Sequence, residues 1–252
     1  MMRSGNPALN EKTFTEAENL SLSSSTGYMT LEGTVQKTAI LLALLTVGAA
    51  WTWHIYFTAG SPSAVLPWLI GGGIAGLILS FITIFNKQQA AIFAPLYAIC
   101  EGLTLGGISG LYESQYPGIV INAVGLTIAT FAALLFAYAT RLIKATENFK
   151  LGVFAATCGI GIVYLADFVL RMFHVSIPYI HDSGPIGIGI SVFIVIIAAL
   201  NLVMDFDFIE QGAAGRVPKY MEWYGSFGLI VTLVWLYLEI LRLLSKAGRS
   251  RS

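Results

Sequence analysis

Charged residues are scarce in this 252-residue chain, at 11% of the total, and the formal net charge at pH 7 is zero. Without an excess of positive charge, the chain lacks the electrostatic signature of a nucleic-acid-binding protein. Its two cysteines and three histidines suggest no disulfide framework and have no spacing that is typical of a zinc site. We therefore expect no nucleic-acid partner, no metal and no other cofactor.

Motifs that carry enzymatic chemistry are missing as well. The sequence contains no glycine-rich phosphate loop and no serine–histidine–acid set. His54, His174 and His181 lie near or beyond the ends of the apolar segments, whereas a seven-helix zinc hydrolase needs ligands that converge inside the bundle. A retinal-binding protein needs a lysine deep in its last helix, and Lys246 lies past that helix. We therefore expect that the protein is not an enzyme.

Long apolar segments dominate what is present, because 56% of the residues are hydrophobic. A helix of about 20 mostly apolar residues crosses the hydrocarbon core of a bilayer. The segments lack the period-two alternation of strands, and lipid requires helices or a closed barrel. The sequence predicts an all-α membrane protein with seven transmembrane helices, at about 36–58, 64–85, 90–112, 117–140, 151–173, 184–206 and 224–244.

The polar residues divide the chain into three parts. Residues 1–34 form a polar tract that buries too little apolar surface to fold alone, so we expect a flexible N-terminal tail without a secretory signal. Residues 35–245 hold the seven-helix transmembrane bundle, and residues 246–252 form a basic C-terminal tail. The lipid bilayer is therefore the first expected partner.

Lysine and arginine predict the orientation of the bundle. They gather before the first segment and in the connections after the second, fourth and sixth segments. Because cytoplasmic loops are enriched in these residues, we expect the N-terminus in the cytoplasm and the bundle in the cell membrane. Seven spans place the C-terminus outside, against the charges of Arg242, Lys246, Arg249 and Arg251. Either the other charges overrule these four, or one segment does not fully cross.

Acids inside the apolar segments are the main candidates for function. A charged side chain at the centre of a membrane helix costs roughly 2.5–3.5 kcal/mol, so those present often mark an ion or proton pathway. Asp205 shares a helix face with Asn201, and we expect it to point inward. Asp207 points about 200° away, and we expect it to reach the cytoplasmic headgroups together with Glu210.

Three further acids lie within the segments. Glu101 is the deepest, with Tyr97 and Thr104 on the same helix face, and is either hydrogen-bonded packing or part of a pathway. Asp167 and Glu239 are secondary candidates, because Arg171 and Arg242 follow at helical spacing and neutralise them locally. Small residues at a spacing of four, as in Gly72 and Gly76 or Gly102, Gly106 and Gly110, predict close helix contacts.

Two runs resemble the Bax inhibitor family of membrane proteins. They are YAICEGLTLG at 97–106 in the third segment and MDFDFI at 204–209 at the end of the sixth, followed by a last helix that closes on LRLL at 241–244. The resemblance covers about residues 35–245, and the NPAL start at 6–9 with its polar tail resembles a bacterial branch. It implies six helices around a central C-terminal seventh. It also implies a pH-sensitive leak for calcium or other cations, gated by two hydrogen-bonded aspartates on the last two helices.

The sequence departs from that pattern in two places. Asp205 matches the first aspartate of the pair, whereas Thr232 stands where the second is expected, and a glycine near Gly72 replaces an acid that the bacterial calcium-leak members carry. Two carboxylates that share a proton repel one another when both ionise, and Thr232 cannot supply this effect. Glu101 replaces the second carboxylate if the fold brings it close to Asp205.

Two functions follow from these residues. In the first, Asp205, Glu101, Thr232 and Asn201 form the pathway and pH gate of a calcium or proton-linked leak, with Asp207, Asp167 and Glu239 as secondary residues. In the second, the protein is a non-conducting regulator that binds another membrane protein, such as a quality-control protease, and the acids only support packing.

Overall fold

A computed structural model describes residues 27–174 and 182–249 of the chain. His181, most of the expected N-terminal tail and the last three residues of the expected C-terminal tail lie outside this part. The described residues form seven long helices and two short 3₁₀ turns, with no strand among them. The elements are α2 (Leu31–Ala59), η1 (Pro62–Ala64), α3 (Leu66–Phe85), η2 (Lys87–Gln89), α4 (Ala90–Gln115), α5 (Ile119–Ala139), α6 (Glu147–Met172), α7 (Pro185–Ala214) and α8 (Met221–Arg249).

All seven helices are long and apolar enough to cross a membrane, which confirms the predicted class of an all-α membrane protein. Their burial differs widely: 61% of the most apolar window of α8 is buried, against 17% for α3. The exposed face of α3 carries large apolar side chains, including Ile74, Leu77 and Phe81. Helix α3 thus has the surface of a lipid-facing helix, and α8 has that of an interior helix.

The helical region extends past the boundaries at 35 and 245 that the hydrophobic pattern suggests. Helix α2 begins at Leu31, because the Thr30 side chain accepts a hydrogen bond from Gly33 N at 3.0 Å and caps the first turn. Helix α8 continues to Arg249. Polar residues at a helix end reduce hydropathy without ending the helix, so the apolar windows were too short.

Glycine and threonine define the ends of several other helices. Gly60 closes α2 with φ 62°, and Gly118 precedes α5 with φ 84°, a region that other residues rarely adopt. Thr146 caps α6 by accepting a hydrogen bond from Phe149 N at 3.3 Å. These residues mark where the three helices begin or end.

The chain divides into two compact units, and helices α7 and α8 contribute to both. The first contains α5, α6, α7 up to Asp207 and α8 from Thr232 onward, and we call it the α5–α6 unit. The second contains α2, α3, α4, the end of α7 from Phe208 and the start of α8 up to Val231, and we call it the α2–α4 unit.

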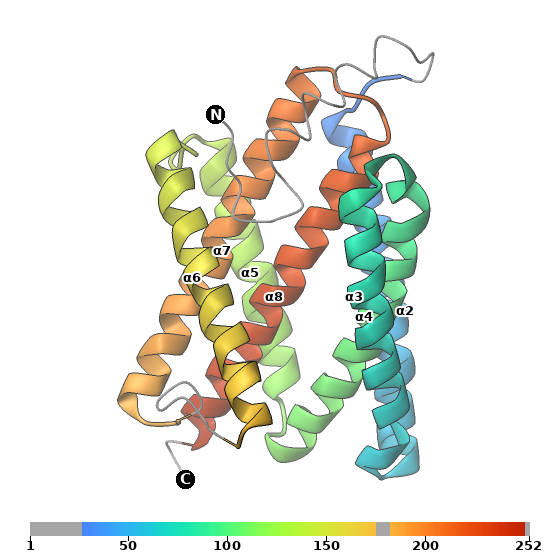
Figure 1. Cartoon of the computed structure of the whole chain (residues 1–252), viewed down its shortest axis with the longest axis vertical. Coiled ribbons are helices and arrows are strands. Elements are labelled where there is room, and N and C mark those ends of the chain that lie inside the picture. Colours follow the sequence, from blue (N-terminus) through green and yellow to red (C-terminus); the bar gives the residue numbers. More distant parts are fainter. Residues whose placement is uncertain (1–26, 175–181, 250–252) are drawn as a thin grey trace. The chain divides into compact units, whose positions relative to one another are not determined.

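Glycines bring the helices of the α2–α4 unit into close contact. Figure 1 shows α2, α3 and α4 side by side. A Cβ at Gly102 or at Gly106 would overlap the backbone of α2, at Leu45 and Ala49 respectively. A Cβ at Gly72 of α3 would lie 2.7 Å from Cys100 O of α4. The predicted small-residue contacts are therefore confirmed, because only glycine permits these approaches.

Isoleucines form the apolar centre of the α5–α6 unit. Ile160 of α6 and the α7 residues Ile194 and Ile197 are buried against one another. Tyr164 of α6 and Trp235 of α8 pack against this cluster. Three helices of the unit therefore meet at one small apolar cluster, and polar groups lie on either side of it along the helices.

Candidate functional site

Asp205 of α7 is completely buried, with an exposed fraction of 0%. This confirms the inward orientation that its position next to Asn201 suggests. Helix α7 continues through this residue to Ala214, so the carboxyl group lies within a helix and not at its end. A buried acid within an apolar helix is costly, and this position is the strongest single candidate for a functional residue.

Asp207 does not extend to the headgroups, as its helical angle suggested. Its Oδ2 lies 2.8 Å from Lys150 Nζ of α6, and its Oδ1 accepts a hydrogen bond from Tyr138 of α5 at 3.3 Å. Glu147 Oε1 lies 3.5 Å from the same lysine nitrogen. The prediction was wrong because a partner on a neighbouring helix satisfies the carboxylate, which a single-helix view cannot detect.

Asn201 lies one turn before Asp205 and is 2% exposed. Its amide nitrogen donates to Thr157 Oγ1 of α6 and to Ile197 O of its own helix, both at 2.8 Å. A carbonyl oxygen only accepts, so the bond to Ile197 defines which end of the amide is nitrogen. Within the described residues Asn201 Oδ1 is buried and accepts no hydrogen bond. An oxygen acceptor therefore lies about one helical turn before Asp205 on α7.

Glu239 of α8 is the centre of a second polar cluster in the same unit. Its Oε1 accepts hydrogen bonds from Tyr164 of α6 at 2.8 Å and from Trp235 at 3.3 Å. Arg242 Nη1 lies 3.1 Å from both carboxylate oxygens and also bonds Tyr164. The expected pairing with Arg242 is confirmed, and the tyrosine and tryptophan were not foreseen.

Lys246 lies in α8 and not in a basic tail. Its Nζ donates to Ser191 Oγ at 2.8 Å and to Gly187 O at 3.1 Å, both of α7, and the residue is buried. The apolar stem of a lysine allows it to remain inside a helix bundle when its ammonium group finds oxygen acceptors. The Asp167–Arg171 pair is confirmed as well, at 2.9 Å from Oδ2 to Nε.

These groups form a polar row along α7, with partners from α6 and α8. From one end to the other, the row consists of Lys150 with Asp207, Asp205, Asn201 with Thr157, Glu239 with Tyr164 and Arg242, and Lys246 with Ser191. The residues from Gly187 to Asp207 cover about 30 Å at 1.5 Å each, which equals the thickness of a bilayer core. Acids and bases thus occur at several depths inside one unit.

Thr232 belongs to the same unit as Asp205 and is buried. Its place opposite the aspartate in a gating pair stays a prediction. Glu101 of α4 belongs to the α2–α4 unit and is half-buried, with Gly76 of α3 close enough that a Cβ there would lie 3.1 Å from Glu101 Oε2. A substitute pair of Glu101 with Asp205 likewise stays a prediction.

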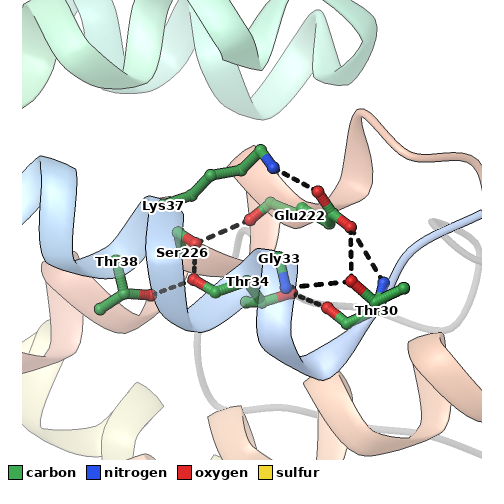
Figure 2. A network of polar contacts seen from close by, with 7 residues as sticks. All are labelled: Thr30, Gly33, Thr34, Lys37, Thr38, Glu222 and Ser226. Carbon is green, nitrogen blue, oxygen red and sulfur yellow. Dashed lines mark hydrogen bonds and ion pairs between the residues drawn. The ribbon is translucent and has the colours of Figure 1, made fainter.

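A buried acid that the hydrophobic pattern did not reveal lies at the start of α8. Glu222 accepts hydrogen bonds from Thr30 N and Thr30 Oγ1, each at 3.0 Å, and forms an ion pair with Lys37 of α2 (Figure 2). Ser226 Oγ, one turn further along α8, lies 2.9 Å from Thr34 O. All of these residues belong to the α2–α4 unit.

Backbone contacts accompany this network. Met29 N donates to Val217 O at 2.8 Å, Lys219 N donates to Gly27 O at 3.0 Å, and Tyr28 forms an isolated bridge with Pro218. In the sequence, Glu222 only has the position of an acid in the first turn of a helix, which is favourable for any helix N-terminus. Because its partner Lys37 is 185 positions away, no local signal identifies the pair.

Together, the seven apolar helices and the buried ionisable groups define a multi-pass membrane protein that holds ionisable side chains in its interior. A family model described as Bax inhibitor 1 like matches residues 6–249, so the chain belongs to the Bax inhibitor 1-like family. The resemblance inferred from the two short runs is thereby confirmed over nearly the whole chain. No curated protein shows a significant match to the sequence.

Proposed function

We propose that the protein is a pH-sensitive leak for calcium or other cations in the cell membrane, and that its pathway follows the polar row of the α5–α6 unit. One observation carries the proposal: Asp205 is fully buried within a row of ionisable and polar groups that continues over the length of a membrane span. Such residues in membrane helices mark ion and proton pathways. Family membership supports the same function.

The chemistry of the row suits a hard cation or a proton. Carboxylate and amide oxygens are the ligands that calcium prefers, and Asp205 and Asn201 supply both kinds one helical turn apart. Asn201 Oδ1 is an acceptor that water or a cation would satisfy. In the ionised state Asp205 attracts a cation, and in the protonated state it does not, so protonation links flux to pH.

Calcium flux into vesicles tests the proposal. The purified protein is reconstituted into liposomes that contain a calcium indicator, and flux is followed from acidic to neutral pH. We expect the wild-type flux to depend on pH and Asp205→Asn to remove that dependence, because the amide does not ionise. Glu32→Gln changes an exposed acid outside the row and serves as the matched control. The proposal is contradicted if the wild-type flux does not change with pH, or if Asp205→Asn has the same flux and pH dependence as the wild type.

The second candidate is a non-conducting regulator of another membrane protein, such as a quality-control protease. The buried threonine at 232 favours it, because the carboxylate pair of a conducting relative is then incomplete. Deletion of residues 1–26 separates the two candidates. The deletion stops before Gly27, because residues 27–30 contact the connection before α8 and the first turn of that helix. A regulator that binds through the tail loses its partner in co-purification, whereas a leak retains its flux.

A further inference from the structure

The polar row is interrupted at one level by the isoleucine cluster. On α7, Ile194 and Ile197 stand between Ser191 and Asn201, which are ten residues or about 15 Å apart. On α6, Ile160 stands between Thr157 and Tyr164. Apolar side chains from both helices therefore meet at one position along the row, and polar groups lie on either side of it.

The cluster is in direct contact with the polar group on one side of it. Tyr164 and Trp235 pack against the isoleucines, and the same two side chains donate hydrogen bonds to Glu239. On the other side, Asn201 bonds to the backbone of Ile197 itself and to Thr157. No more than one helical turn on α7 separates the apolar cluster from the nearest buried amide.

We propose that Ile160, Ile194 and Ile197 form the permeation barrier of this pathway, an apolar constriction that excludes water and ions between the Asn201 level and the Glu239 level. The inference rests on the proposed function. Apolar constrictions close channels by dewetting, because a hydrated ion finds no polar partners there. The aspartate at 205 then sets how cations and protons load the pathway, and the isoleucines set whether they pass.

Two of the three isoleucines have an exposed isoleucine close by on the same helix. Ile197 and Ile160 are each 8% exposed, whereas the neighbours Ile196 and Ile162 are 50% and 68% exposed. The two residues of each pair lie in one helix, so Ile197 and Ile160 each have a control at nearly the same depth. A substitution at the control position changes the same chemical group without changing the interior.

The experiment compares threonine with valine, which have nearly the same shape and differ by a hydroxyl in place of a methyl group. The triple variant with Ile160→Thr, Ile194→Thr and Ile197→Thr is set beside the triple valine variant in the calcium-flux assay. We expect the threonine protein to conduct on the order of tenfold faster than the valine protein, because hydroxyls give water a partner at the constriction. Ile196→Thr and Ile162→Thr are expected to leave the flux at the wild-type level.

Equal flux through the folded threonine and valine proteins contradicts the proposed barrier. In that case the proposed leak is still supported if the wild type conducts and Asp205→Asn changes its flux. If neither the wild type nor any isoleucine variant conducts, the leak and the barrier both fail. Should the triple variant not fold, as judged by its elution volume and circular dichroism, Ile197→Thr against Ile197→Val gives the same comparison at one position.

Discussion

Lys37 of α2 and Glu222 of α8 form an ion pair across 185 positions of the chain. The glutamate side chain is almost fully buried: Lys37 pairs with its Oε2, and Thr30 donates two further hydrogen bonds to its Oε1. A Cβ at Gly33 would overlap this carboxylate, so the glycine makes room for it. The start of the first described helix is therefore bound to the start of the last one through a single buried acid.

Removal of that charge is expected to destabilise the protein. Glu222→Gln leaves the Lys37 ammonium without its counter-charge, and the loss of one partner of a buried pair costs about 3 kcal/mol. The measurement is the apparent melting temperature in detergent. Glu32→Gln, on the exposed face of α2, is expected to change stability by no more than about 0.5 kcal/mol. Similar melting temperatures for the two variants would show that the pair contributes little.

For the Lys150–Asp207 pair, we expect that a second substitution restores part of the stability that the first one removes. Lys150→Met removes the cation from a largely buried carboxylate and is expected to destabilise by about 3 kcal/mol. Adding Asp207→Asn removes the orphaned charge, so the double variant is expected to be more stable than Lys150→Met alone. Lys144→Met, at an exposed position in the connection that precedes α6, is the control. A double variant that is less stable than Lys150→Met argues against charge burial as the cause.

Two glycine substitutions are expected to have effects of opposite sign. Gly106→Ala places a methyl group against Ala49 O and Thr52 Oγ1 of α2, where it has no room, and is expected to destabilise by about 1–3 kcal/mol. Gly125→Ala in α5 meets no atom within 4 Å and is expected to stabilise by about 0.5–1 kcal/mol through helix propensity. Thermal unfolding in detergent distinguishes them, and a destabilising Gly125→Ala would contradict the second expectation.

The membrane topology provides a fourth prediction. Seven spans place the two ends of the chain on opposite sides, and the C-terminal positive charges are the only argument against it. Lys246 is buried against Ser191 and Gly187, so this cation is not available to headgroups and weighs less in the charge rule. Reporter fusions after residue 252 and before residue 1 are therefore expected to report opposite compartments. The same compartment for both ends would mean that one helix does not cross.

The hydrophobic pattern predicted the helices well, because a membrane span requires a long apolar run wherever it lies in the chain. It placed all seven, and it identified Asp205 as inward-facing from the shared face with Asn201. Pairs that lie within one helix, such as Asp167 with Arg171, were also predictable, since i, i+4 spacing brings them together in any helix. The sequence alone therefore determined the features that depend on one helix: its position, its inward face and the side-chain pairs within it.

Tertiary structure decided everything that needs two helices. Asp207 was expected at the headgroups and instead meets Lys150, and Lys246 was expected in a tail and instead lies buried against α7. Glu222 lies outside the last segment that the hydrophobic pattern predicted, and its partners Lys37 and Thr30 come from the other end of the chain (Figure 2). The reason is physical: a buried charge is tolerated only with a partner, and that partner is supplied by whichever helix packs beside it, not by neighbours in the sequence.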